Sequence, residues 1–148
     1  MSIWKKKTDL AHLNALSEDT LIAHLGIEYT QIGDDFLQAT MPVDDRTRQP
    51  HGILHGGASV VLAETLGSVA ANLAVTQGKV CVGLEINASH LRSVKSGVVT
   101  GTVTAVRIGR TAQVWQIDIS NERQQLICTS RLTVSVIDQP KSITPVLD

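Results

Sequence analysis

Aromatic residues are scarce in this chain, where phenylalanine, tyrosine and tryptophan together make up 3% of the 148 residues. Proteins that stack nucleic-acid bases on aromatic side chains need more of them. The formal net charge of -1 also offers no attraction to nucleic acid or to an anionic membrane. No apolar run reaches the roughly twenty residues of a membrane span. We therefore expect neither nucleic acid nor membrane as a partner.

Cysteine is almost as rare, with two residues, Cys81 and Cys128, each among apolar neighbours. This setting predicts reduced thiols in the core. The three lysines near the start are followed by no apolar stretch, so the pattern of a secretory signal is missing. A cytoplasmic protein is expected.

The length suits one domain with a single core. We expect this domain to span residues 1–138 and to be followed by a flexible tail over residues 139–148, which contain two prolines. The first 25 residues resemble short amphipathic helices, with Thr8 and Ser17 as N-caps and Gly26 as a stop.

The patterns that follow predict six strands and one long helix. Two strand-like runs flank Gly33-Asp34-Asp35, which signals a hairpin. Residues 57–75 carry apolar side chains in nearly every direction around a helical axis, so this helix should be buried on most sides. Four strand-like runs come after it, joined in part by the turns RIGRTA and SNERQ. Alternation predicts buried faces formed by Val99, Val103 and Ala105, and by Leu126, Cys128, Leu132, Val134 and Val136.

A single antiparallel sheet that must cover one face will wrap around the helix. The predicted architecture is therefore α+β, a hotdog fold with an antiparallel sheet wrapped around one long central helix.

One charged side chain, Glu64, interrupts the apolar helix; residues 49–78 contain no other Asp, Glu, Lys or Arg. It lies about two turns into the helix, too far to offset the dipole at the first turn. A buried structural ion pair and a functional carboxylate both remain open. Gly67, Ser68 and Ala71 share its face and are small, which predicts a hollow beside it. Ser68 could hold a water molecule or hydrogen-bond the carboxylate.

His55, Gly56 and Gly57 open the helix. Backbone N–H groups there lack helical partners, and glycine lets a ligand approach closely, so they can hold a developing oxyanion. A tight turn into the helix is compatible with this role. The spacing of His51 and His55 could suggest a metal, but nearby glycine and proline oppose a helix and no third ligand is evident. We expect no metal; a histidine that caps the helix or donates to a carbonyl is favoured.

The distance between Gly56 and Glu64 along the helix indicates how the protein assembles. Gly56 and Glu64 are eight residues apart, about 12 Å along a helix. Groups acting on one carbonyl must lie about 3 Å from the reacting atoms. The simplest solution is a homodimer in which one chain provides Gly56 and the other Glu64.

The pattern Gln49-Pro50-x-Gly52-x-x-His55-Gly56-Gly57-x-Ser59-x-x-x-x-Glu64-Thr65 resembles the hotdog-fold acyl-CoA thioesterases that hydrolyse aryl-CoA esters. The stretches HLGIE, MPVDDRTRQP, VGLEINASHLRSVKSG, GRTAQVWQIDI and SRLTVSV extend the likeness over nearly all of the chain except the tail. The bacterial branch with the dihydroxynaphthoyl-CoA and enterobactin proofreading thioesterases is the most similar.

The resemblance implies a role for each residue of this pattern. Glu64 would attack the thioester or act as general base, and the family leaves that choice open. Gly56 N–H would contact the oxyanion, while Gln49 and His55 would orient the thioester and Ser68 would position water. Gln49, His55 and Gly56 would face Glu64 and Ser68 of the partner subunit.

The resemblance also implies coenzyme A contacts in two segments and one glycine: His90, Leu91, Arg92 and Ser93 at a strand end, Arg107, Ile108, Gly109, Arg110, Thr111 and Ala112 in a hairpin turn, and Gly83 beside the pantetheine path. Relatives usually carry proline in place of Ser93, and each arginine could equally be a solvated turn residue. No cofactor is expected, because acyl-CoA is the substrate. Carrier-protein thioesters are a further candidate, and dimers are expected to pair into a homotetramer.

Two rival interpretations remain. A hotdog dehydratase or hydratase would pair Glu64 with His55 as base. A non-catalytic acyl-CoA-binding module would have no need of Glu64. The residues do not distinguish an aromatic from an aliphatic acyl group.

Overall fold

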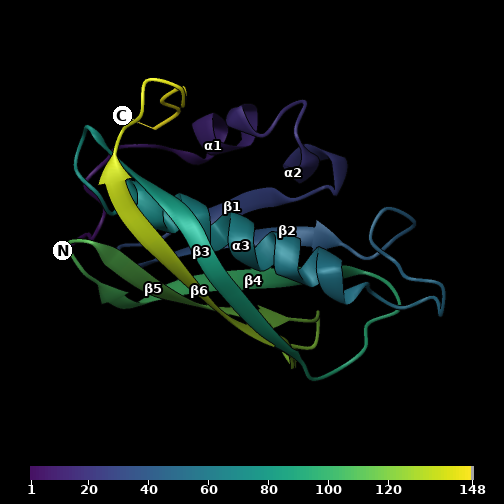
Figure 1. Ribbon diagram of the computed structural model, residues 1–148. Helices are drawn as coiled ribbons and strands as arrows, with labels where there is room; N and C mark the ends of the chain where they lie inside the picture. Colours follow the sequence, from purple (N-terminus) through teal and green to yellow (C-terminus); the bar gives the residue numbers. More distant parts are fainter. Residues whose placement is uncertain (148) are drawn as a thin grey trace.

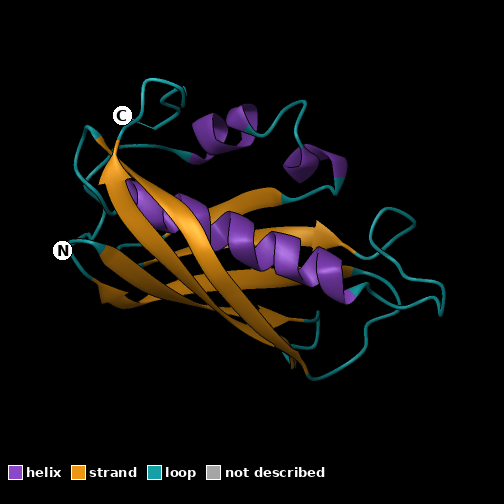
Figure 2. Ribbon diagram, viewed as in Figure 1, coloured by secondary structure: helices purple, strands orange, loops and turns teal. Residues whose placement is uncertain are grey.

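A computed structural model describes residues 1–147 of the protein; Asp148, the last residue of the expected tail, lies outside the described residues. A six-stranded antiparallel sheet curves around one long helix, α3 (Gly56–Leu73) (Figure 1). Figure 2 shows this helix lying along the curved strands with one side left open, and the two short N-terminal helices set apart from it. The predicted α+β hotdog fold is confirmed.

The sheet has the order β1-β2-β4-β5-β6-β3, and each neighbouring pair is antiparallel. Its strands are β1 (Glu28–Ile32), β2 (Phe36–Pro42), β3 (Lys79–His90), β4 (Val98–Ile108), β5 (Ala112–Ser120) and β6 (Leu126–Asp138). The hairpin and both turns expected from the sequence are present. Strand β3 ends the order, so one of its sides has no partner strand within the described residues.

The predicted buried faces hold except at one residue of each face. Val99 and Val103 are fully buried, but Ala105 is exposed although it pairs in register with the buried Trp115, because it lies in residues 104–108, an exposed end of β4. Leu126 is 41% exposed and Ile127 is buried in its place, next to another shift between Ile119 and Ser120. A one-residue shift turns side chains to the opposite face of a sheet, which accounts for Leu126. Both predictions, for Ala105 and for Leu126, were wrong.

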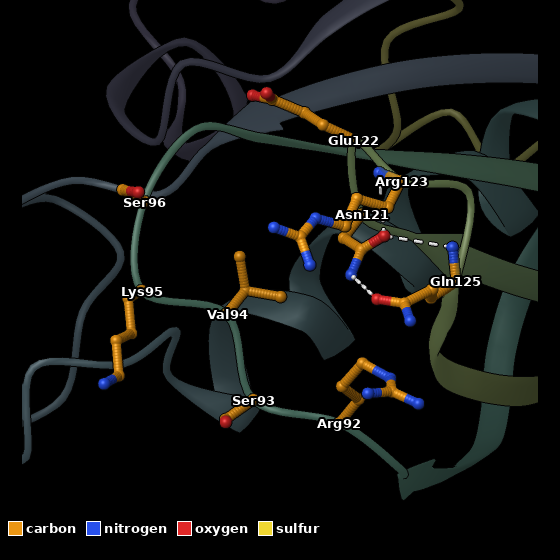
Figure 3. Close-up of a pocket in the computed structure, with 9 residues that line it drawn as sticks. All are labelled: Arg92, Ser93, Val94, Lys95, Ser96, Asn121, Glu122, Arg123 and Gln125. Carbon is orange, nitrogen blue, oxygen red and sulfur yellow. Dashed lines mark hydrogen bonds between the residues drawn. The ribbon is translucent and has the colours of Figure 1, made fainter.

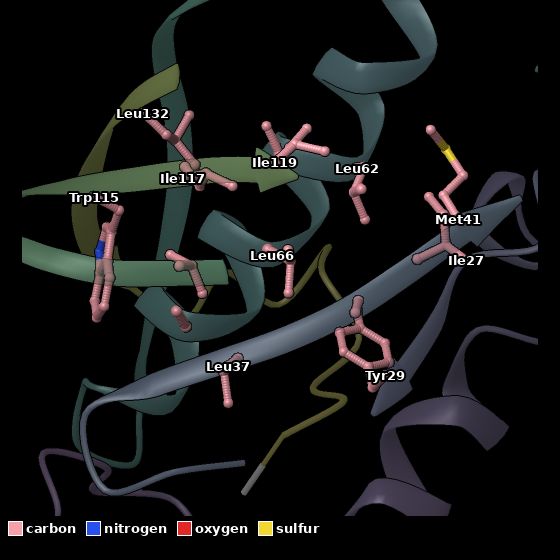
Figure 4. Close-up of a cluster of buried hydrophobic side chains, with 14 of the residues drawn as sticks. Ile27, Tyr29, Leu37, Met41, Leu62, Leu66, Trp115, Ile117, Ile119 and Leu132 are labelled. Carbon is pink, nitrogen blue, oxygen red and sulfur yellow. The ribbon is translucent and has the colours of Figure 1, made fainter. Parts of the chain in front are cut away.

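Helix α3 packs its buried side chains against the concave face of the sheet (Figure 4). Leu62 and Leu66 lie over Gly101 of β4, where a Cβ atom would come within 2.7 Å of Leu66 Cδ1. Gly67 meets β5 and β6 as closely, since a Cβ atom there would lie 2.5 Å from Leu132 Cδ2. These contacts fix which face of α3 remains outside the core.

The first two helices begin later than expected. Helix α1 (Leu10–Leu16) is capped by Asp9 and helix α2 (Leu21–His24) by Thr20, not by Thr8 and Ser17. The Asp9 carboxylate accepts the N–H of His12, whereas the Ser17 hydroxyl donates to a carbonyl at the end of α1. Gly26 has a φ of 72° and stops α2 as predicted.

The C-terminal residues 139–147 return to the body of the protein. The Gln139 N–H donates to Gly78 O, and Leu147 is buried. The domain boundary at residue 138 and the flexibility of the tail stay predictions. None of the helices formed by residues 1–147 combines the length and hydrophobicity of a transmembrane segment.

Candidate active site

The N-terminus of α3 presents a free backbone donor. His55 caps the helix, as expected: its Nδ1 accepts the Gly57 N–H at 2.8 Å. The N–H groups of Ala58 and Ser59 donate to the His55 carbonyl. Among the described residues no hydrogen bond engages the Gly56 N–H. This donor is therefore available to a ligand.

His90, at the end of β3, lies beside Gly56. A Cβ atom at Gly56 would come within 2.9 Å of His90 Nε2, so any larger residue there would require the imidazole to move. The expectation from the sequence placed His90 with the nucleotide; the structure places it at the helix N-terminus.

The loop before α3 holds Gln49 in a tight turn. Its N–H donates to Ile53 O, its carbonyl accepts the Gly52 N–H, and Gly52 adopts a φ of 80°. The Gln49 Oε1 accepts the His51 N–H at 2.6 Å. With that oxygen engaged, the amide nitrogen is the end of the side chain that can donate to a ligand.

A cavity of about 370 Å³, here called the Gly56 cavity, collects these groups. Six of the residues singled out in the sequence line it: Gln49, Gly56, His90, Leu91, Arg92 and Ser93. The structure thus joins Gln49 and Gly56 to the first expected coenzyme A segment, whereas His55, also expected beside the thioester, is not among the lining residues.

Glu64 lies in a different place, on the half-buried outer face of α3. Within residues 1–147 it forms no ion pair, so the structural ion-pair interpretation finds no support there. A Cβ atom at Gly83 would lie 2.9 Å from Glu64 Oε1, next to a bulge in β3. Gly83 therefore makes room for the carboxylate; its pantetheine role stays a prediction.

The hollow beside Glu64, here called the Glu64 cavity, has a volume of about 370 Å³ and includes Ser68, as expected. Gly67 and Ala71 were expected there too, but Gly67 packs against Leu132 and Ala71 is fully buried. The lining comes instead from Leu21, Ile22, Val61, Glu64, Thr65, Ser68 and Val69. Helix α2, which supplies Leu21 and Ile22, was not foreseen as a wall.

The second expected coenzyme A segment, residues 107–112, forms the turn between β4 and β5. Ile108, Gly109 and Arg110 line a separate cavity of about 350 Å³ that includes Lys5 and Gln113. It has no lining residue in common with the Gly56 or the Glu64 cavity. Arg107, Thr111 and Ala112 are exposed in the same turn. Within one chain, residues 90–93 and residues 107–112 therefore do not line a common cavity.

A polar hollow of about 540 Å³ continues from the Gly56 cavity and shares Arg92 and Ser93 with it (Figure 3). Lys95 and Arg123 join Arg92 as positively charged side chains in its lining. None of these three side chains pairs with a carboxylate among the described residues. Asn121 shapes the turn by accepting the N–H groups of Arg123 and Gln125 at 3.0 Å. Sequence reasoning missed Lys95 and Arg123, because no spacing relates the β5–β6 turn to the end of β3.

Metal ligands and reactive thiols are not evident near these cavities. No group of three or more His, Cys, Asp or Glu side chains gathers within the described residues. Cys81 and Cys128 are buried and unpaired, as expected. Burial raises the pKa of Cys81 to about 11 and also raises the pKa of Cys128, which disfavours the reactive thiolate.

The wrapped sheet and single central helix make this chain a hotdog-fold protein. Residues 51–128 match the family described as the thioesterase superfamily, and the chain belongs to that family. It is a thioester hydrolase.

Relatives agree with this assignment. The chain is 52% identical over 135 residues to the 1,4-dihydroxy-2-naphthoyl-CoA hydrolase of Escherichia coli, covering 91% of this chain and 99% of that protein. It is 54% identical over 135 residues to the proofreading thioesterase EntH of Cronobacter turicensis, covering 91% and 98%. A thioesterase structure from Haemophilus influenzae superposes with a TM-score of 0.92 at 53% identity, covering 96% of this chain and 99% of that one.

Proposed function

We propose that this thioester hydrolase cleaves acyl-CoA thioesters, aryl-CoA esters among them, with Glu64 as nucleophile or general base. The observation that carries the proposal is the position of the Glu64 carboxylate. It has no ion-pair partner in the described residues, and it lies at the edge of a largely apolar cavity on the outer face of α3. The names of the Escherichia coli and Cronobacter relatives support thioesters of this class.

In the proposed reaction, acyl-CoA and water give a carboxylate and free coenzyme A. Negative charge develops on the thioester oxygen, and the Gly56 N–H with the N-terminal dipole of α3 stabilises it. Gln49 and His55 orient the thioester, and Ser68 positions water beside Glu64. Thiolate is a fair leaving group, so no cofactor is needed in this scheme.

The proposed active unit is a homodimer. In one chain Gly56 and Glu64 line separate cavities, about 12 Å apart along α3. The outer edge of β3 is 12 residues long, has no partner strand in the described residues and exposes 65% of Leu84. Such an edge is suited to pairing with a second chain. Glu64 and Ser68 of one copy would then face the partner's Gln49, His55 and Gly56.

The coenzyme A phosphates would lie in the polar hollow next to the Gly56 cavity. Arg92 and Ser93 border both spaces, and Lys95 and Arg123 supply further positive charge. Residues 107–112 lie elsewhere in the same chain, so they could join this site only from another copy. Either the partner of the proposed homodimer or a further copy in the proposed homotetramer would have to supply them. Carrier-protein thioesters and a cytoplasmic location stay proposals.

The substitution Glu64→Gln tests the chemistry, since the amide keeps the shape but can neither attack nor accept a proton. We expect turnover to fall by about 10²-fold or more. Thiol released from benzoyl-CoA is measured with a chromogenic thiol reagent. Glu28→Gln, an exposed change in β1 at the opposite edge of the sheet, is the matched control and should retain full activity. A Glu64→Gln enzyme within threefold of wild type would remove Glu64 from the mechanism.

The same assay separates the rivals. A hydratase or dehydratase changes the acyl chain without releasing thiol, and a binding module releases none. Within this chain His55 Nδ1 accepts the Gly57 N–H as the cap of α3, so in the neutral ring Nε2 carries the proton and can donate a hydrogen bond but cannot serve as a base.

A further inference from the structure

Lys6 is a buried cation, with 7% of its surface exposed. Its backbone N–H donates to Leu73 O at the C-terminal end of α3, and its Nζ donates to Lys79 O at 3.0 Å. An ammonium group has three donors, and this is the one side-chain hydrogen bond that Lys6 makes among the described residues. No described carboxylate pairs with it. Buried ammonium groups are ordinarily paired, so the position calls for an acceptor.

Lys6 lines a cavity of about 240 Å³, here called the tail cavity, between α3, β3 and the C-terminal residues. Its apolar walls are Val69, Val80, Ile143, Val146 and Leu147. Figure 1 shows the C-terminal segment, in yellow, near the C-terminal end of α3. An apolar space with one cation is suited to an apolar group that ends in an oxygen acceptor.

The tail cavity adjoins the Glu64 cavity, because Ser68 and Val69 line both. Ser68 lies one helical turn after Glu64. A group bound beside Glu64 can therefore continue along the outer face of α3 toward Lys6.

We propose that the tail cavity is the far part of the acyl site and takes an extended acyl chain that ends in a carboxylate or hydroxyl, hydrogen-bonded by Lys6. This rests on the proposed acyl-CoA hydrolysis. Glu64 and Leu73 are nine residues apart, about 13 Å along the helix; the backbone of Lys6 lies at Leu73, and its ammonium donates to Lys79 O at the start of β3. A single aromatic ring is too short to span this distance, whereas an extended medium-length chain reaches it.

The test compares kcat/KM for four thioesters: benzoyl-CoA, decanoyl-CoA, and the ω-hydroxy and ω-carboxy derivatives of decanoyl-CoA. Wild type should favour the two derivatives over decanoyl-CoA by about tenfold, since hydrogen bonds to charged groups are worth that much. Lys6→Met should abolish this preference and leave benzoyl-CoA within twofold. Lys7→Met, a neighbouring exposed lysine, is the matched control and should change nothing.

Val80→Phe provides a second variant that keeps Lys6, with its folding checked by circular dichroism. The larger ring should fill the tail cavity and raise KM for all three long substrates about tenfold, with benzoyl-CoA unaffected. Equal losses on all four thioesters, or a preference that survives Lys6→Met, would overturn the inference. Cleavage of benzoyl-CoA alone by wild type would also overturn it while the proposed function stands. If no thioester is cleaved, the proposed function fails and this inference fails with it.

Discussion

Gly83→Ala should separate activity from stability. The new methyl group would lie 2.9 Å from Glu64 Oε1 and 3.9 Å from Leu132 Cδ1, so only the carboxylate is crowded. Gly83 does not have a positive φ, so alanine causes no backbone strain there. The substitution thus places a methyl group of β3 in steric conflict with one oxygen of the Glu64 carboxylate.

The size of the effect follows from the geometry. Relief to an ordinary contact of about 3.4 Å requires the carboxylate to move by roughly half an ångström. Because a misplacement of 1 Å can cost about a hundredfold in rate, we expect kcat to fall about tenfold. Stability should hold or rise, since glycine within a strand costs about 0.5–1 kcal/mol relative to alanine. For a chain of this size, Tm should therefore change by no more than about 4 °C.

The assay is thiol release from benzoyl-CoA beside a thermal unfolding curve for the same sample. Gly101→Ala is the control, because its methyl group would lie 2.7 Å from Leu66 Cδ1 and would crowd the core instead of Glu64. That variant should lose about 1–3 kcal/mol of stability. A Gly83→Ala enzyme with wild-type kcat, or one that loses stability as Gly101→Ala does, would refute the reasoning.

Three further outcomes are expected. Burial raises the pKa of Tyr29 to about 12, whereas the unfolded chain loses this proton at its ordinary pKa of about 10, so the free energy of unfolding should fall by about 2–3 kcal/mol between pH 10 and pH 12. Urea unfolding should show a larger loss in wild type than in Tyr29→Phe. Equal losses in both proteins would contradict this expectation. Cys81 and Cys128 should not react with a thiol reagent at pH 8 until guanidinium unfolds the chain, and fast labelling of native protein would show that they are accessible. Leu84→Lys on the exposed β3 edge should shift the protein toward monomer in light scattering and lower its specific activity on dilution, whereas a monomer with full activity would argue against the shared site.

The sequence was informative where a pattern is local. Apolar residues around the whole axis predicted α3 to within two residues at its C-terminal end. Two-residue alternation predicted the buried faces of Val103 and Leu132, but not the exposure of Ala105 and Leu126. The exposure of Leu126 depends on a register shift, which arises from how β5 and β6 pair and leaves no periodic signal. Ala105 keeps its register opposite Trp115, and its exposure depends on where the rest of the protein stops covering β4.

In the candidate site, too, the sequence predicted local features but not contacts between distant residues. Glu64 stands out in the sequence as the one carboxylate in an apolar helix, and Gly56 as part of a glycine pair at its start. That Gly83 faces Glu64, and that His90 faces Gly56, could not be read from spacing, because each pair joins residues about twenty or more positions apart. The same holds for Lys6, whose environment is built from the end of α3, the start of β3 and the tail.

By itself the sequence determined which segments are helix and strand, which faces are apolar and which carboxylate is exceptional, since periodicity and composition act within a few residues. The curvature and register of the sheet decided which of those residues share a cavity. They set the distances between groups far apart in the chain, and these distances decide what chemistry the groups can do together.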